Sequence, residues 1–308
     1  MILRYDRLAR YPAVFQAMTG LNVKEFDALA EDLVPALVAA LIAGRDRPDR
    51  DRAPGGGHPF DLGHRDQLLL TVAWLRQYPI LAVLGDLFGV SKSTASRVIA
   101  RVLPVLEAAG RDTMRMPEPG RQRRKELADL LADTPELAVV IDTFEQPIER
   151  PAGRAAADPF YSGKKKRHTL KVQVAVDEET GRLVDVSESF PGPTGDMAVL
   201  RASGLFDRLP PGVGALGDLA YVGADKVAPG VAASAPRRKP RGRPRPEEDI
   251  AYNREFARRR VVVEHSIGRL RRFKATAEVD RHHRRHHARR VRAAAGLVNR
   301  QLRHGAAC

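Results

Sequence analysis

Three acidic residues stand where they could act together on a phosphodiester. Asp142 directly follows the apolar run Leu137–Ile141, and Asp218 closely follows the apolar stretch Val213–Leu216. Glu264 lies within a long segment of helical pattern. Carboxylate oxygens are the ligands that Mg²⁺ and Mn²⁺ prefer, and two such ions can activate the attacking oxygen and stabilise the leaving oxygen. The residue types therefore predict a metal-binding and catalytic set of three acids that holds two Mg²⁺ or Mn²⁺ ions.

Basic residues flank Glu264 on the same predicted helix face. Arg260 precedes it by one turn, Gly268 follows by one turn and Arg271 by two, so that one stripe carries a carboxylate between cations. A phosphate backbone could cross such a stripe, which makes Arg260 and Arg271 candidate DNA ligands. Arg260 and Glu264 could equally form a surface ion pair, worth only about 0.3–0.5 kcal/mol. Both interpretations can hold at once.

The elements that would position these acids follow in a definite order. The pattern of apolar residues predicts a strand, a hairpin, a helix, a strand and a long helix. These elements cover residues 137–141, 168–177 with 182–190, 196–209, 213–216 and 250–274. That order matches the ribonuclease H-like arrangement, in which acids from two strands and a late helix converge, although many α/β domains share it.

The chain before this region is predicted to be helical. Apolar residues recur every three or four positions from Asn22 to Ala43, and a second helical block runs from His64 to Ala109. Tyr78-Pro79 and Gly89 break the second block, and the segment Arg45–His58, rich in Pro, Gly and charge, is expected to be a loop. The fold class expected is thus an all-α N-terminal helix-turn-helix domain followed by an α/β ribonuclease H-like catalytic domain.

Four parts follow from these boundaries. They are an N-terminal helical region (1–59), a helix-turn-helix domain (60–112), a linker (113–134) and a catalytic domain with a basic C-terminal tail (135–308).

The helix-turn-helix is predicted within Ile80–Arg101. The pattern gives a first helix, a turn at Gly89-Val90, an N-cap at Ser91 and a second helix that could enter the major groove. An ordinary helical hairpin with a polar face would show the same pattern. The candidate DNA ligands on the second helix are Lys92, Ser93, Thr94, Ser96 and Arg97.

Two further basic segments are candidates for phosphate binding. The first comprises Lys164, Lys165, Lys166, Arg167 and His168, with Lys171 beyond them, and could also be a solvated charge run.

The second basic segment, RRKPRGRPRP, contains Arg241 and Arg243. It resembles an AT-hook that places arginines in a narrow minor groove, or it is a generic basic connector.

A histidine-rich segment, RHHRRHHARR, lies near the C-terminus. His282 with His286, and His283 with His287, are four residues apart, a spacing that could chelate a metal on a helix. The surrounding arginines would repel a cation. A basic tail that contacts DNA or RNA is the preferred interpretation.

Composition favours nucleic acid as the partner. The 308 residues include 52 Lys and Arg against 38 Asp and Glu, a formal net charge of +14, which attracts polyanions. No apolar run reaches the roughly 18 residues of a transmembrane helix, so no membrane association is expected. The single cysteine, Cys308, excludes a disulfide framework and fits a reducing cytoplasm. No signal peptide is predicted at the N-terminus.

Four ordered motifs carry a resemblance to a known family. The segments VVIDTFEQPIERP, YSGKKKRHTLKVQVAVD, GDLAYVG and RRRVVVEHSIGRLRRFK resemble the DDE transposases of bacterial insertion sequences, especially the insertion-sequence-five group related to Harbinger transposases. The likeness covers roughly residues Asp61 to Arg300.

The resemblance implies a transposase that binds the inverted-repeat ends of an insertion sequence and performs strand cleavage and strand transfer. Its cofactor would be two Mg²⁺ or Mn²⁺ ions held by Asp142, Asp218 and Glu264. Its partner would be double-stranded DNA, bound as a homodimer or higher oligomer at the bacterial nucleoid.

The alternatives are a domesticated transposase or regulator that binds without cutting, and a defence or repair nuclease with the same core. The sequence departs from the family pattern at the signature around Glu264, where Ala257 replaces Tyr and Arg271 replaces Lys, and at Gly195, where relatives commonly have His.

Overall fold

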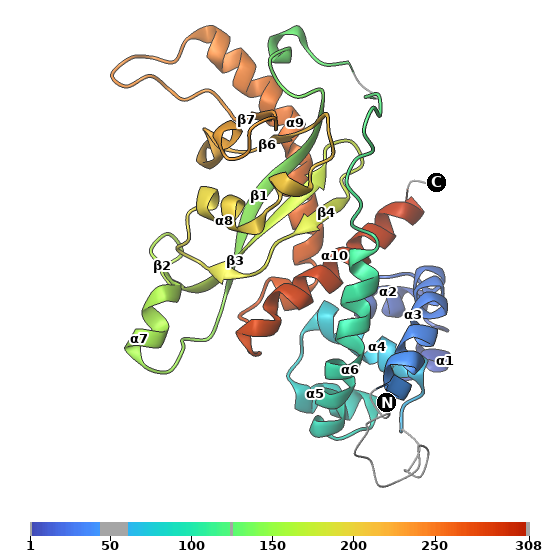
Figure 1. Cartoon of the computed structure of the whole chain (residues 1–308). Helices are drawn as coiled ribbons and strands as arrows, with labels where there is room; N and C mark the ends of the chain where they lie inside the picture. The colour runs from blue at the N-terminus through green and yellow to red at the C-terminus, as the bar shows by residue number, and fades with distance from the viewer. Residues whose placement is uncertain (1, 44–60, 124–125, 306–308) are drawn as a thin grey trace. The chain divides into compact units, whose positions relative to one another are not determined.

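The computed structural model describes residues 2–43, 61–123 and 126–305 (Figure 1). The described chain divides into two compact units, which are treated separately below. The first is formed from residues of 1–112, 271–276 and 289–308, and the second from 113–270 and 277–288. None of the described helices combines the length and the hydropathy that a membrane span requires.

The first unit is helical, as the sequence predicts. Its helices are α1 (Tyr5–Leu8), α2 (Pro12–Thr19), α3 (Val23–Ala43), α4 (His64–Gln77), α5 (Leu81–Phe88), α6 (Lys92–Arg111) and most of α10 (His287–Gly305). α4 forms the centre of this unit, because every residue from Gln67 to Leu75 is buried. The predicted breaks are confirmed, since Tyr78 and Gly89 both adopt the left-handed conformation that ends a helix. The predicted loop Arg45–His58 lies outside the described residues.

α5 and α6 form a tight helical hairpin. A Cβ atom on Gly85 would lie only 2.5 Å from the carbonyl oxygen of Val90, so only glycine allows the turn to approach the first helix this closely. Ser91 caps α6, because its hydroxyl accepts a hydrogen bond from the backbone N–H of Thr94 at 3.1 Å. The turn and the cap are those that the sequence predicts.

α10 packs directly against α6. A Cβ atom on Gly296 would lie 2.3 Å from the Cα of Gly110, so the two helix backbones meet at a pair of glycines. Glu107 on α6 accepts hydrogen bonds from Arg289 at 2.9 Å and from Arg292 at 3.3 Å. By their contacts, residues from 289 onward therefore belong to the helical unit and not to the α/β unit, although the sequence-based boundaries place them in the catalytic domain. The functional division of the chain into four parts stays a prediction.

The second unit is built on a mixed sheet. Its strands are β1 (Leu137–Pro147), β2 (Tyr161–Ser162), β3 (Arg167–Asp177), β4 (Leu183–Val186), β5 (Phe190–Pro191), β6 (Val213–Leu216) and β7 (Ala233–Ser234). The order is β2-β3-β1-β6-β7, with β4 and β5 also paired to β3. β1 is antiparallel to β3 and parallel to β6. The fold is thus a helical region followed by a mixed α/β unit.

Three helices accompany the sheet: α7 (Arg154–Ala157), α8 (Asp196–Ser203) and α9 (Glu247–Arg271). Leu137, Val139 and Ile141, odd-numbered residues in the first half of β1, belong to the same hydrophobic core as Leu200 of α8. Figure 1 shows α8 and the long α9 against the sheet. The side chain of Arg260 on α9 approaches Asp142, an even-numbered residue of β1, so α8 and α9 serve opposite faces.

Three predicted boundaries differ from the structure. β1 continues six residues past Ile141 to Pro147, because polar residues alternate there with buried Phe144 and Gln146. α8 ends at Ser203 rather than Leu209, since Gly204 is left-handed with a φ of 61°. α9 begins at Glu247, three residues earlier than predicted, and its first turn carries three acids that favour a helix start.

The glycine contact between α6 and α10 leads to a stability test. Gly296→Ala should destabilise the protein by about 1–3 kcal/mol, because the added methyl group overlaps the backbone of α6. Gly268→Ala on α9 is the matched control, since a Cβ there meets nothing within 4 Å. It should stabilise the protein by about 0.5–1 kcal/mol through helix propensity. Chemical denaturation followed by circular dichroism measures both, and equal effects would contradict the close helix contact.

Candidate active site

Strand register brings two of the predicted acids to one level of the sheet. β1 and β6 are parallel, with Val140 opposite Leu216, and Asp142 and Asp218 each stand two residues further along. Asp218 is half-buried, and its carboxylate accepts a hydrogen bond from the backbone N–H of Ala220 at 2.8 Å. Neighbouring parallel strands therefore present the two acids side by side.

Arg260 on α9 connects the third acid to the first. Its Nη2 atom lies 3.9 Å from Oδ2 of Asp142 and 3.6 Å from Oε1 of Glu264. The Arg260 side chain is only 12% exposed, whereas that of Glu264 is 51% exposed. Arg260 thus lies between two of the predicted acids and is largely buried there, which goes beyond a simple surface ion pair.

The electrostatic surroundings act on Asp142. Its pKa is raised to about 6, mainly by burial, and the negative charges of Asp218 and Glu264 contribute to the rise. The backbone N–H of Thr143 and the guanidinium of Arg260 oppose this shift without cancelling it. A carboxylate in this position favours a nearby cation, because a positive charge would relieve both the burial and the repulsion.

The three predicted metal ligands are carboxylates, and carboxylate oxygens are the type of ligand that a hard divalent cation prefers. One of the three, Asp142, is partly buried. The arrangement is open rather than closed. Among the described residues, no group of three or more Asp, Glu, His or Cys side chains lies close enough to hold a metal ion. Arg260 supplies the positive charge between the acids instead.

A second polar chain lies behind the first acid. Lys171 on β3 donates hydrogen bonds to Oδ1 of Asp196 at 2.8 Å and to the carbonyl oxygen of Thr194 at 2.6 Å. Thr143 donates from its hydroxyl to the same Asp196 oxygen at 2.8 Å, and from its backbone N–H to Asp142 at 2.7 Å. Lys171 is therefore a buried structural cation and not part of an exposed phosphate-binding patch, which corrects the sequence-based interpretation.

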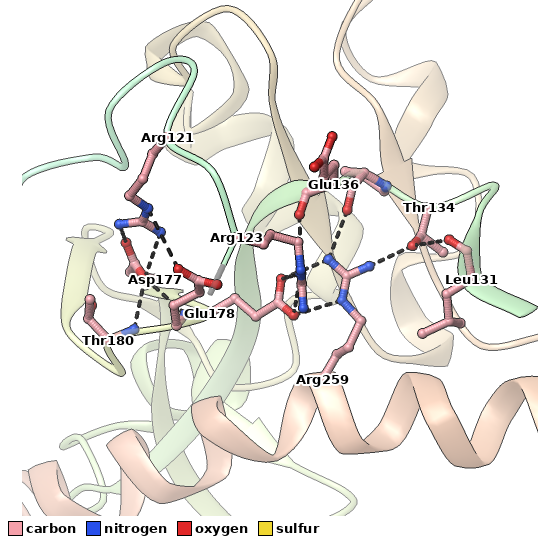
Figure 2. A network of polar contacts seen from close by, with 11 residues as sticks. Arg121, Arg123, Leu131, Thr134, Glu136, Asp177, Glu178, Thr180 and Arg259 are labelled. Carbon is pink, nitrogen blue, oxygen red and sulfur yellow. Dashed lines mark hydrogen bonds and ion pairs between the residues drawn. The ribbon is translucent and has the colours of Figure 1, made fainter. Parts of the chain in front are cut away.

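Figure 2 shows the polar network that fastens α9 to the sheet. Both carboxylate oxygens of Glu178 accept hydrogen bonds at 2.7 Å from Arg259, one from Nε and one from Nη2. Arg123 donates to the same carboxylate at 2.9 and 3.0 Å, and Arg259 also reaches the carbonyl oxygen of Pro135 at 2.8 Å. Arg259 directly precedes Arg260, so this network determines which way the active-site face of α9 points.

Arg121 and Asp177 extend the network (Figure 2). Arg121 donates to both carboxylate oxygens of Asp177, at 2.8 and 3.2 Å. Burial raises the pKa of Asp177, but the hydrogen bonds from Arg121 and from the backbone N–H groups of Thr180 and Glu179 outweigh it and hold the pKa below its usual range. The turn after β3 is thereby fixed on the same side as Glu178.

The predicted DNA ligands on α6 are exposed, except Thr94, which is half-buried beside the cap. Ala95, Val98 and Ile99 form the buried face of the same helix. Arg97 donates hydrogen bonds to the carbonyl oxygen of Ser93 and the hydroxyl of Thr94, which keep it close to the helix surface. α6 therefore presents a polar face in its first two turns.

The other predicted ligands lie at the surface. Lys164, Lys165, Lys166 and Arg167 are exposed at the turn before β3, and His168 is half-buried. Arg241 and Arg243 are exposed in the segment before α9, and Arg271 is exposed at its end. Among the predicted DNA ligands in the described part of the α/β unit, Arg260 forms the ion pairs with Asp142 and Glu264.

The histidine-rich segment differs from its predicted form. His282 and His283 precede the helix, which begins at His287, so neither pair is presented on one helix. His287 is fully buried, with Nδ1 2.7 Å from the hydroxyl of Ser189 and Nε2 2.8 Å from Oε1 of Gln146. The helical metal-binding alternative is wrong for both pairs, and buried His287 is not available for the predicted contact of a basic tail with DNA or RNA.

Two family models match different parts of the chain. A model described as DDE superfamily endonuclease matches residues 141–299, and one described as helix-turn-helix of DDE superfamily endonuclease matches residues 61–112. The first match begins one residue before Asp142, and the second contains α5 and α6. These matches make the protein a nuclease that carries its own helix-turn-helix domain, which implies DNA binding.

Similar proteins include transposases and a nuclease. The "Probable transposase for insertion sequence element IS702" of Microchaete diplosiphon is 30% identical, over 94% of each chain. The "Putative transposase for insertion sequence element IS112" of Streptomyces albus G is 26% identical, over 86% of each chain. Human "Putative nuclease HARBI1" is 28% identical, over 58% of this chain and 48% of its own.

No solved structure matches the sequence. The family match and the full-length likeness to an insertion-sequence transposase establish that the chain belongs to the DDE superfamily endonucleases. It is accordingly an endonuclease, and members of this superfamily generally use divalent metal ions.

The network around Glu178 makes a direct prediction. Arg259→Met should destabilise the protein by about 3–5 kcal/mol, because it leaves the buried Glu178 without one of its two cations. Arg258→Met is the matched control on the same helix, since the Arg258 side chain is 62% exposed and pairs with nearby Glu255. Its effect should stay within about 0.5 kcal/mol. Chemical denaturation measures the difference, and similar values for the two variants would show that the network does not hold α9.

Proposed function

We propose that the protein is the transposase of an insertion sequence, with Asp142, Asp218 and Glu264 as its catalytic and metal-binding acids. The surroundings of Asp142 carry this proposal, because Arg260 pairs with both Asp142 and Glu264 and the charges of Asp218 and Glu264 both act on Asp142. The strand order around β1 and the late helix α9 support a ribonuclease H-like core. The full-length similarity to insertion-sequence transposases supports transposition over a repair or defence role.

The chemistry proposed is two successive displacements at phosphorus. Water attacks the phosphodiester at the element's end, the bond from phosphorus to the 3′ oxygen breaks, and a 3′-hydroxyl is released. That hydroxyl then attacks a phosphodiester of the target DNA, so that one bond to phosphorus forms as another breaks. No covalent bond between protein and DNA is needed.

The chain's own residues would prepare the site for these steps. Asp142 is held by the backbone N–H of Thr143, whose hydroxyl is fixed by Asp196. Arg260 is placed to pair with a phosphate oxygen once the acids have another counter-charge. Two Mg²⁺ or Mn²⁺ ions, bound by the three acids, would activate the attacking oxygen and stabilise the leaving one.

DNA binding is assigned to two kinds of surface. The exposed face of α6 would read the inverted repeats in the major groove, through Lys92, Ser93, Thr94, Ser96 and Arg97. The basic segments with Lys164 to His168, Arg241, Arg243 and Arg271 would contact phosphates without reading sequence. A transposase that joins two ends would act as a homodimer or higher oligomer on the DNA.

Removing a single charge at each acid tests the catalytic assignment. Asp142→Asn, Asp218→Asn and Glu264→Gln should each abolish cleavage of labelled inverted-repeat DNA and leave end binding nearly intact, because the amide keeps the shape but loses the charge that holds the cation. A double variant should be scarcely slower than a single one, since the acids act as a unit.

The control for this test is wild-type protein with Mg²⁺, with Mn²⁺ and with EDTA. Cleavage that persists in EDTA or in Asp218→Asn would contradict the two-metal mechanism. Binding without cleavage by the wild type would favour a protein that has kept its DNA sites and lost its chemistry.

A second experiment tests the recognition helix. Replacing Lys92 and Arg97 together with Ala should weaken specific binding to the inverted repeat by about tenfold or more, because each base or phosphate contact contributes on the order of 1 kcal/mol or more. Replacing exposed Arg10 and Lys24 with Ala removes the same charge from elsewhere in the helical unit. Gel-shift titration measures both, and equal losses would show a charge effect rather than readout by α6.

A further inference from the structure

An aromatic side chain is exposed beside the most basic turn of the α/β unit. Tyr161 on β2 is 47% exposed, and its ring packs edge-on against His168, with 5.5 Å between ring centroids. The turn that follows and the first residue of β3 carry four consecutive exposed cations, Lys164 to Arg167. Tyr161 thus offers an open ring face, supported from one side, next to a concentration of positive charge.

The histidine-rich segment completes this surface. The guanidinium of Arg284 lies 4.5 Å from the ring centroid of Phe160, which places the segment Arg281–His286 next to the start of β2. Arg281, His283 and Arg285 are exposed on it. Positive charge from two segments that are more than 100 residues apart in sequence therefore gathers around Phe160 and Tyr161.

A hollow of about 390 Å³ opens beside Arg284. Its walls combine apolar, basic and acidic groups, among them Ile148, Pro151, Glu149, Asp280, His282 and His283. A flat, partly apolar group that carries hydrogen-bonding edges, such as a nucleobase, suits such a lining.

The surface also lies in line with the candidate active site. Tyr161 on β2 pairs with His168 on β3. Six residues further along β3, Val174 pairs with Asp142 on β1. Even-numbered positions of a regular strand share one face, so Tyr161 and Asp142 stand on the same face, about 20 Å apart along β3. At duplex spacing of about 3.4 Å per nucleotide, roughly six nucleotides would cover that distance.

We infer that Tyr161, with the basic groups of Lys164–Arg167 and Arg281–His286, forms a binding site for an unpaired DNA strand. An exposed aromatic ring among cations is what single strands bind, because bases stack on the ring while phosphates meet the charges. A duplex keeps its bases stacked inside and cannot use Tyr161 in this way. The inference rests on the proposed function, which would bring a cleaved or distorted DNA end to this surface.

Binding of single-stranded DNA to the full-length protein in EDTA tests this inference without requiring cleavage. Labelled oligothymidylate of about 16 nucleotides is titrated by fluorescence anisotropy, beside a duplex of the inverted repeat. Tyr161→Ala should weaken single-strand binding by about fivefold to 100-fold, because one base loses its stacking on the ring. The same variant should change duplex binding little. Tyr161→Phe should retain the affinity, because the ring remains.

Tyr11→Ala is the matched control, since Tyr11 is exposed to 57% and belongs to the helical unit. It should leave both affinities unchanged. Unaltered single-strand binding by Tyr161→Ala would overturn the inference, and so would equal losses for single strand and duplex. If Tyr161→Ala reduces single-strand binding while the wild type fails to cleave DNA, the binding site stands and the proposed function falls.

Photocrosslinking gives a second readout that needs no variant. Inverted-repeat DNA with an unpaired end is substituted with 5-iodouracil at successive positions, irradiated with the wild-type protein and analysed by mass spectrometry. The crosslink should map to Tyr161 and be strongest about six nucleotides from the cleavage position. Crosslinks that avoid residues 160–168 and 281–286 would overturn the inference.

Discussion

Glu178 accepts hydrogen bonds from two guanidinium groups inside the α/β unit, and the geometry of the active site depends on this arrangement. The side chains of Glu178 and Arg259 are 6% and 5% exposed, and that of Arg123 is 11% exposed. Charges this deeply buried are tolerated only when they are paired, so the three segments that carry them must meet. They are the segment before β1, the turn after β3 and α9. Because Arg259 is held inward, Arg260 and Glu264 are directed to Asp142.

In the candidate active site, the positive charge of Arg260 reduces the repulsion between acidic side chains. Burial raises the free energy of the ionised form of Asp142, and the negative charges of Asp218 and Glu264 add to this effect. Arg260 offsets part of this repulsion from its position between Asp142 and Glu264. The negative charge that remains favours divalent ions, and the added positive charge of these ions together with Arg260 then favours a phosphate. The site is therefore suited to bind the ions and the phosphate together.

The local features of the fold could be predicted from sequence. Helical periodicity located α3 and the α4–α6 block, and the chemistry of Gly89 and Ser91 located the turn and the cap. Asp142 and Asp218 are predicted as site residues because each follows an apolar strand pattern, and Glu264 because of its basic neighbours and the family resemblance. In each case the signal lies within a few residues of the feature itself.

The parts that sequence did not predict depend on distant pairing. Lys171 was expected at the surface because it follows a run of exposed cations, yet its partner Asp196 is 25 residues away. His287 was grouped with a basic tail, and its partner Gln146 is 141 residues away. Arg259 gave no signal at all, since its role requires Glu178. Charged and polar residues of this kind become predictable only once the strand register is known.

Metal binding is the property on which the catalytic account depends, and it can be measured without DNA. Titration of the purified protein with Mn²⁺, followed by electron paramagnetic resonance, reports the number of bound ions and their affinity. The account predicts about two bound Mn²⁺ ions per chain in the wild type, with the affinity strongly reduced in Asp142→Asn and unchanged in Asp207→Asn, an exposed acid elsewhere in the same unit. Equal Mn²⁺ binding by the wild type and Asp142→Asn would contradict it.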